Sequence, residues 1–305
     1  MSTFLISRLL QGVLVLFGVS LFSFLFIFLS GDPVAGLAQP DWTQEQVEDL
    51  RRELGFDRPV WIQYLDYLQR VVRGDFGNSY RQHQPVFRLL SERLPATMEL
   101  ALAGFLLSLV VGVPIGVVSA VKRDTLVDQG AMFAALLAQA MPTFWLGIML
   151  ILFVGVELRW LPISGRGTLA HIVLPALTLA TYSMARNARL VRSSLLDVLH
   201  QDYVRTARAK GLTGTIVIYK HALRNALVPV VTVMGLDFGS LLSGAVITEI
   251  VFAWPGLGRL IVNAVSSRDL PLVQGSVLLV GSFFVLINLL VDMSYAVLNP
   301  RVRHD

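Results

Sequence analysis

The sequence contains no cysteine, which excludes disulfides, thiolate metal ligands and cysteine catalysis and leaves the redox compartment open. Charged residues are also scarce. They make up 15% of the 305 residues, whereas about 25% is usual in a soluble domain. Hydrophobic residues make up 54% of the chain. This composition indicates an integral membrane protein.

The motifs of common enzyme classes are missing as well. A Walker A loop needs a glycine directly before its lysine, and none of the three lysines follows a glycine. There is no H-E-x-x-H sequence, and Gly239-Ser240 lacks the flanking pattern of a serine nucleophile elbow. His171 and His221 are isolated, with no histidine at metal-binding spacing. We therefore predict no catalytic residue, no metal site and no cofactor in this chain.

Basic residues exceed acidic ones by 25 to 21, which gives a net charge of +4. Of the 25 basic residues, 22 are arginines. A guanidinium is more weakly hydrated than an ammonium, so it is easier to hold near a membrane interface. The basic excess therefore indicates loops in contact with membrane lipid and predicts no nucleic-acid partner.

Six apolar stretches approach or exceed the roughly 20 residues that a helix needs to cross a bilayer. They are residues 9–29, 100–121, 130–156, 171–190, 226–248 and 272–297. The first is longer than the apolar region of a signal peptide, which is about 7–15 residues, so we expect it to remain uncleaved. The sequence predicts an all-α integral membrane protein with six transmembrane helices.

The fourth stretch is the least apolar, because Arg186 and Arg189 follow Met184 within two helical turns. Long arginine side chains can reach the membrane interface by extending along the helix. Both arginines are therefore compatible with a membrane span, and we expect the helix to continue into the cytoplasm.

The distribution of basic residues predicts the orientation. Basic residues concentrate in short cytoplasmic loops, and with the N-terminus inside these segments hold Arg8, Lys122, Arg123 and the eight basic residues from Arg186 to Arg224. The short outer loops hold only four arginines. Loops longer than about 60 residues cross largely regardless of charge, so the arginines of residues 30–99 do not count. We predict a multi-pass protein of the cytoplasmic membrane with both termini cytoplasmic.

Residues 30–99 form a long extracytoplasmic loop that predicts two helices. Thr43 and Gln46 have capping-box spacing, and Gly55 would end that helix. Pro59 opens a second helical pattern that Gly74 ends, with apolar positions Ile62, Leu65, Leu68 and Val72. Its amphipathic character fits either a cap on the outer membrane surface or a docking surface for an extracytoplasmic partner. The predicted layout is residues 1–29, the loop 30–99 and a five-helix core over 100–305.

Asp237 is the only carboxylate in the middle of a predicted span. A charged residue costs about 2.5–3.5 kcal/mol at the bilayer centre, so Asp237 must face the bundle, a water-filled path or a partner chain. Either it lines the translocation path and favours substrates with a positive amine, or it makes a fixed hydrogen bond to a neighbouring helix. Glu249 and Asp292 lie near span ends, where interface solvation makes structural roles inexpensive. We expect Gln139 to hydrogen-bond between helices.

The segment Phe252–Arg259 joins the fifth and sixth spans. We expect Trp254 to be an interfacial anchor and Pro255-Gly256 to form a turn.

Residues 201–225, QDYVRTARAKGLTGTIVIYKHALRN, form a basic segment between two apolar stretches. An interrupted apolar stripe predicts a helix over about 193–210, with Gly211 as its C-terminal stop. Small residues at Thr206, Ala207 and Ala209 would let this helix sit deeply in a groove of another protein. The alternative is an amphipathic helix lying on anionic lipid.

The order of residues in this segment resembles the cytoplasmic coupling motif of ABC importer permeases, written E-A-A-x3-G-x9-I-x-L-P. The chain departs from that motif at Arg205, Thr206, His221 and Arg224. The wording RTARAKG and HALRNA resembles the dipeptide/oligopeptide/nickel branch. Further matches are Gly31-Asp32-Pro33, Leu54-Gly55-Phe56-Asp57-Arg58-Pro59, Gly74-Asp75-Phe76-Gly77, Trp254-Pro255-Gly256-Leu257-Gly258-Arg259, Arg268-Asp269-Leu270-Pro271 and Asn299-Pro300-Arg301.

This resemblance implies the type I ABC importer permease fold and a subunit that moves dipeptides, oligopeptides or glutathione by alternating access. The implied partners are a second homologous permease chain, two P-loop ATPase subunits that bind ATP and Mg, and an extracytoplasmic solute-binding protein. The implied ATPase-coupling residues are Asp202, Tyr203, Arg205, Thr206, Ala207, Arg208, Ala209, Lys210, Gly211, His221, Leu223 and Arg224. A nickel-chelate permease of the same family and an ion-coupled secondary carrier using Asp237 remain as alternatives.

Overall fold

The computed structural model describes residues 2–29, 34 and 42–298. Two of the sequence motifs, Gly31-Asp32-Pro33 and Asn299-Pro300-Arg301, lie outside these residues, and the side chain of Asp292 is also not described. Helices are the regular elements of the described chain, in which one isolated bridge, Asn78 with Pro85, is the only β-type pairing. The elements are α1 (Ser2–Leu29), α2 (Gln44–Glu53), α3 (Val60–Val72), α4 (Val86–Val121), α5 (Leu126–Ala140), α6 (Thr143–Leu150), η1 (Ile151–Glu157), α7 (Leu169–Leu199), α8 (Asp202–Ala209), α9 (Gly214–Ile216), η2 (Val217–Ala222), α10 (Leu223–Val251), α11 (Leu257–Ser266) and α12 (Leu270–Leu298).

The chain divides into two compact units. The first comprises residues 1–95 and 259–289, and the second comprises residues 96–258 and 290–305. The helices α4 and α12 each run from one unit into the other.

Three helical stretches of the described chain are long and apolar enough to cross a membrane: Ile6–Leu25, Val86–Val121 and Leu270–Leu290. Two bent pairs raise the number to five if each pair is one span. The first pair is α5 with Thr143–Glu157, bent by 105°, and the second is Gly214–Val231 with Val233–Leu242, bent by 43°. The predicted fourth stretch, 171–190, lies within α7, which is not among them. The predicted stretch 130–156 falls on helices that meet at Pro142, because proline has no N–H to continue the α5 hydrogen-bond pattern.

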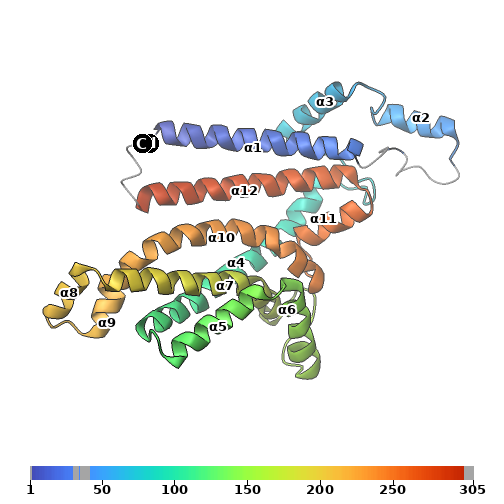
Figure 1. The fold of residues 1–305 in the computed structure, drawn as a ribbon. Coiled ribbons are helices and arrows are strands. Elements are labelled where there is room, and N and C mark those ends of the chain that lie inside the picture. Colours follow the sequence, from blue (N-terminus) through green and yellow to red (C-terminus); the bar gives the residue numbers. More distant parts are fainter. Residues whose placement is uncertain (1, 30–33, 35–41, 299–305) are drawn as a thin grey trace. The chain divides into compact units, whose positions relative to one another are not determined.

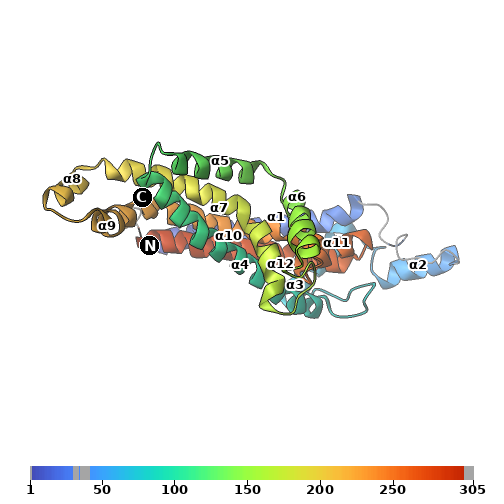
Figure 2. The ribbon, with the colours of Figure 1, turned by 90° about the horizontal axis from the view of Figure 1, so that it is seen from below.

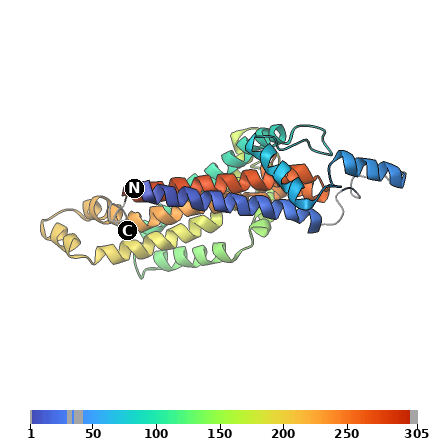
Figure 3. The same ribbon diagram turned by 90° about the horizontal axis from the view of Figure 1, so that it is seen from above.

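In the first unit, α1 and α12 lie side by side (Figures 1 and 3). A Cβ atom on Gly12 would lie 2.8 Å from Val285 Cγ1, so the two helices approach closely at this point. The helix α3 packs against α1, where Tyr64 Oη and Ser20 Oγ are 2.9 Å apart. The Phe24 and Tyr67 rings stack with their centroids 5.7 Å apart.

Two helices, α2 and α3, lie at the positions that the sequence predicts for them; the extracytoplasmic location of this segment stays a prediction. Thr43 caps α2 in a capping box with Gln46, and Gly55 and Gly74 follow the two helices with φ of +74° and +77°. The predicted apolar stripe of α3 is only partly buried: Ile62 and Leu68 are half-buried, whereas Leu65 and Val72 are exposed. Tyr64 and Tyr67 make the packing contacts. Aromatic rings bury more area than the aliphatic side chains, and their hydroxyls find polar partners.

In the first unit, a group of hydrogen bonds joins the segment between α3 and α4 to the residue just before α12. The buried Asp269 carboxylate accepts hydrogen bonds from the Ser79 hydroxyl, from Tyr80 N at 3.1 Å and from Arg81 N at 3.3 Å. Burial raises the pKa of the neighbouring Tyr80 phenol. The helix α4 begins at Val86, so the last part of the predicted 30–99 loop is already helical.

In the second unit, α7 packs against α5, α6 and α10 (Figures 1 and 2). Glycines bring α4 against α7 as well. A Cβ atom on Gly112 would lie 2.8 Å from the Met184 carbonyl oxygen, and one on Gly116 would lie 2.5 Å from the Ala188 carbonyl oxygen. Two glycines four residues apart therefore let the backbones of α4 and α7 come into contact.

The turn after α10 corrects two sequence expectations. Trp254 is not an interfacial anchor: it is 1% exposed, and its Nε1 donates to the Ala96 carbonyl at 2.8 Å. Glu249 is not solvated at an interface, because it is fully buried and accepts a 2.6 Å hydrogen bond from Thr97 Oγ1. A Cβ atom on Gly256 would overlap the Glu249 carboxylate, so the Pro255-Gly256 turn closes directly over this side chain.

The glycine contact between α4 and α7 predicts a specific stability loss. Gly116→Ala places a methyl group against the Ala188 carbonyl and the Val191 side chain, and overpacking of this kind costs about 1–3 kcal/mol. We expect the purified protein to unfold several degrees earlier on heating. Gly130→Ala in α5 is the matched control, because a Cβ atom there meets nothing within 4 Å. Equal unfolding temperatures for the two variants would contradict the close packing.

Candidate functional site

The basic segment folds as a hairpin between the end of α7 and the start of α10 (Figures 1 and 3). Val204 and Ala207 form the buried face of α8 and pack with Val217 and Ala222 of η2. Gly211 adopts a φ of +78° directly after α8, a conformation that glycine reaches without steric cost. The predicted stop at Gly211 is therefore confirmed.

The predicted single helix over 193–210 is two helices. α7 ends at Leu199, and Gln201 takes an extended conformation with ψ of 149° before α8 begins. The His200 ring takes part in a 2.7 Å hydrogen bond with the Leu196 carbonyl and so satisfies the last turn of α7. Asp202 then lies in the first turn of α8, where a carboxylate complements the helix dipole.

Most of the predicted coupling residues lie on the outer surface of the hairpin. Ala207 is buried within the chain and is not available to a partner, and His221 and Leu223 are half-buried. The exposed residues are Asp202, Tyr203, Arg205, Thr206, Arg208, Ala209, Lys210, Gly211 and Arg224. Arg205 Nη1 lies 3.7 Å from Asp202 Oδ1, in an exposed ion pair. Arg208, Lys210 and Arg224 then make the exposed surface of the hairpin basic.

The hairpin stands on a continuous apolar core. Its buried residues join those of α4, α7 and α10 in one cluster, which includes Val117, Val191, Leu195, Ala226 and Val230. Two polar contacts add to the connection: Ser194 Oγ donates to the Ala226 carbonyl at 2.7 Å, and Asn225 Nδ2 donates to Tyr203 Oη at 2.8 Å. The hairpin and the three long helices therefore share one closely packed core.

Three arginines on one side of α7 reach neighbouring helices. Arg186 Nη1 lies 2.8 Å from Asp237 Oδ1 of α10, and Arg189 Nη1 lies 2.6 Å from Gln139 Oε1 of α5. Arg192 pairs with Asp128 of α5. Acceptors on adjacent helices lie within reach of both Arg186 and Arg189, and their reach to a membrane interface stays a prediction. Gln139 accepts between helices, and α7 continues past the predicted span as expected.

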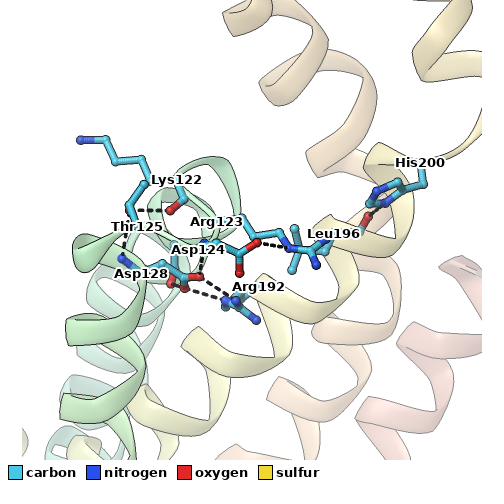
Figure 4. A network of polar contacts seen from close by, with 9 residues as sticks. Lys122, Arg123, Asp124, Thr125, Asp128, Arg192, Leu196 and His200 are labelled. Carbon is cyan, nitrogen blue, oxygen red and sulfur yellow. Dashed lines mark hydrogen bonds and ion pairs between the residues drawn. The ribbon is translucent and has the colours of Figure 1, made fainter.

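The Asp128–Arg192 pair fastens the start of α5 to α7 (Figure 4). Arg192 donates from Nε and Nη2 to the two carboxylate oxygens, each at 2.7 Å, in the bidentate geometry typical of strong arginine–carboxylate pairs. Asp128 also accepts from the Ser119 hydroxyl and, at 3.0 Å, from Asp124 N. A single carboxylate thus joins the end of α4 and the start of α5 to the C-terminal half of α7.

Asp237 is 2% exposed, whereas the Arg186 side chain bonded to it is 43% exposed. The carboxylate faces its ion-pair partner, which is the fixed contact to a neighbouring helix that the sequence left open as an alternative. A role for Asp237 in the translocation path stays a prediction.

Sequence reasoning missed several residues that organise the hairpin and its base: Asp128, Arg192, Ser194 and Asn225. One signal was present for Asp128, since it follows Lys122-Arg123 at the start of an apolar run and has Thr125 at N-cap spacing. The hydrogen bonds of Ser194 and Asn225 have no signature in the sequence. Their partners, the Ala226 carbonyl and the Tyr203 hydroxyl, lie 32 and 22 residues away along the chain.

Two family models match the chain. One, described as binding-protein-dependent transport system inner membrane component, matches residues 112–304. The other, described as binding-protein-dependent transport system membrane component, N-terminal, matches residues 1–101.

Curated relatives match over the whole length. The dipeptide transport system permease protein DppB of Escherichia coli (strain K12) is 42% identical over 337 residues, covering 100% of this chain and 99% of the relative. The glutathione transport system permease protein GsiC of the same strain is 43% identical over 305 residues, covering 100% of both chains. The di/tripeptide transport system permease protein DppB of Pseudomonas aeruginosa (strain UCBPP-PA14) is 41% identical over 337 residues, covering 100% of both chains.

Solved structures share the fold. A chain of the MetNI methionine ABC transporter in an inward facing conformation has a TM-score of 0.56 at 21% identity, covering 69% of this chain and 96% of that one. A chain of an amino acid ABC transporter has a TM-score of 0.53 at 15% identity, covering 68% and 94%. The likeness extends to the fold of type I ABC importer permeases.

The Asp128–Arg192 pair predicts an unequal effect of two neighbouring substitutions. Asp128→Asn leaves the Arg192 guanidinium, whose side chain is only 26% exposed, without its counter-charge. We expect a loss of about 3 kcal/mol in the free energy of unfolding, near the lower limit for broken buried pairs. Asp124→Asn is the control, because its pair with Arg123 is exposed and is worth at most about 1 kcal/mol. Thermal unfolding of both purified variants makes the comparison, and similar losses would refute the special role of Asp128.

Proposed function

The chain belongs to the family of binding-protein-dependent transport system inner membrane components, and from this premise we propose that it is the permease subunit of an ABC importer for small peptides. In this role it moves short peptides across the cytoplasmic membrane by alternating access, with ATP and Mg bound by separate ATPase subunits. Identity above 40% along the whole chain to dipeptide, di/tripeptide and glutathione permeases supports the peptide substrate. The same relatives favour the importer over an ion-coupled carrier using Asp237 and over a nickel-chelate permease.

We propose a six-span topology with both termini in the cytoplasm. The three long apolar helices and the two bent pairs supply five spans, and α7 supplies the sixth. α7 can cross despite its arginines, because neighbouring helices supply acceptors for them. The distribution of basic residues in short loops supports the orientation.

The α8 hairpin is proposed as the surface that docks on an ATPase subunit. Its exposed residues are basic or small, and its buried residues fuse with the cores of α4, α7 and α10. Docking on such a surface would move these helices together when the two ATPase subunits close. α2 has no buried residue. We therefore propose that α2, on the extracytoplasmic side of the membrane, contacts the solute-binding protein. A second homologous permease chain completes the proposed complex.

The function is tested with the complex purified through this chain and reconstituted into liposomes. We expect two P-loop ATPase subunits and a second permease chain to accompany it, and dialanine uptake to require ATP and the solute-binding protein. Uptake driven by an ion gradient without ATP would overturn the importer.

Reversal of charge on the hairpin tests the docking surface. Arg208→Glu puts an acidic side chain on the exposed face of α8, and disruption of an interfacial charge contact is expected to lower ATP-dependent uptake roughly tenfold or more. Arg123→Glu is the control, because Arg123 is an exposed cation outside the hairpin. Recovery of the ATPase subunits in the purified complex shows whether docking itself is lost. Full ATPase recovery and normal uptake with Arg208→Glu would remove the hairpin from the docking interface.

A further inference from the structure

A cavity of about 470 Å³ lies beside the break between α5 and α6, within the second unit. Its walls are the end of α5, the start of α6 and one face each of α7 and α10. None of its lining residues, all of them described, is charged; the polar groups are the Gln139 amide and hydroxyls such as those of Thr143, Tyr182 and Ser240. The volume falls within the roughly 300–1,000 Å³ usual for small-molecule sites.

Two arginines of α7 lie next to this cavity, although neither is one of its lining residues. On α7, Arg186 and Arg189 follow the lining residues Tyr182 and Ser183 by about one and two turns. Arg189 also bonds directly to Gln139, which lines the cavity. Among the residues that the structure describes, the carboxylate paired with either arginine is that of Asp237, one turn before Ser240 on α10.

The two arginines differ in how far their charge is compensated. Arg186 is paired with a carboxylate, so the charges of Arg186 and Asp237 largely cancel. Arg189 is bonded to a neutral amide oxygen and is exposed, so it keeps its positive charge and has further N–H donors available. Two further ionisable side chains on the wall-forming helices have partners of their own: Arg192 is bound to Asp128, and Glu249 accepts from Thr97. The end of the cavity next to Arg186 and Arg189 therefore carries about one net positive charge.

We propose that this cavity receives the transported peptide and that Arg189 binds the C-terminal carboxylate of that peptide. The inference rests on the proposed function and adds the chemical group that the permease itself recognises. A guanidinium binds a carboxylate through two parallel N–H donors, while the amide and hydroxyl groups of the wall meet the peptide backbone. Asp237 is buried beneath Arg186, so its charge is not available to the amino group of the peptide. The permease thus selects for the acidic end of its substrate, the reverse of attraction of an amine by Asp237.

Labelling with oppositely charged thiol reagents measures the sign of the electrostatic potential in the cavity. Because the natural chain has no cysteine, Ser240→Cys places its only thiol at the exposed wall position of α10. The complete complex in nanodiscs is treated with sulfonatoethyl or trimethylammonium-ethyl methanethiosulfonate, and the adduct on this chain is quantified by mass spectrometry. Each rate is divided by the rate of the same reagent with a free thiol in solution.

We expect the anionic reagent to react faster than the cationic one. Adding Arg189→Gln should lower this rate ratio roughly fivefold, as expected for the loss of one nearby unit charge. Arg166→Gln is the matched control, since it removes an equal charge from an exposed pair with Glu99 outside the cavity wall. A preference for the cationic reagent, or a ratio that Arg189→Gln leaves unchanged, would overturn the proposal.

Protection by substrate tests carboxylate recognition separately. Dialanine, at concentrations that saturate uptake by the wild-type complex, should slow the labelling of Ser240→Cys, whereas dialanine amide should not. Arg189→Gln should abolish the protection by dialanine. Equal protection by the two compounds, or none by either, would overturn the carboxylate site. The proposed function fails on a different result, namely the absence of ATP-dependent dialanine uptake by the wild-type complex.

Discussion

The second unit depends on how α7 satisfies its charged side chains in a low-dielectric setting. An ionised group without a partner is costly there, yet this helix presents Arg186, Arg189 and Arg192 along one side. Each finds an acceptor on α5 or α10. These contacts join α7 to neighbouring helices. The bonds that satisfy the charged side chains of α7 therefore also hold α5 and α10 in place against it. The glycines of α4 complete this arrangement by allowing direct backbone contact with α7.

This arrangement links the two ends of the proposed mechanism. The hairpin after α7 shares one apolar core with the ends of α4, α7 and α10, and the cavity is walled in part by α7 and α10. In the proposed mechanism, α7 and α10 would take part in both docking and transport, so no long-range signal between the two would be needed. The Asp128–Arg192 pair adds α5 to this body at the hairpin end, and the break at Pro142 marks where α5 gives way to α6 beside the cavity.

The turn after α10 shows how polar groups can be buried without an aqueous interface. Glu249, Thr97 and the Trp254 indole each have a hydrogen-bond partner within the second unit. Thr97 both donates to the carboxylate and accepts from Leu257 N, so one hydroxyl serves two elements. Gly256 makes room for the carboxylate beneath the turn. Hydrogen bonding thus replaces the solvation that a position near a span end would otherwise require.

The sequence by itself determined the helical class, most helix positions, the capping of α2, the glycine stop after α8 and the family, because these follow from local periodicity, capping chemistry and ordered motifs. Only the tertiary structure decided the break between α7 and α8, the buried positions of Trp254 and Glu249, and the partners of the α7 arginines. A side chain that can snorkel and one that can pair look the same in a sequence. The difference lies in whether an acceptor such as Gln139 or Asp237 stands within about 3 Å on another helix, which depends on the packing of segments 50 residues apart.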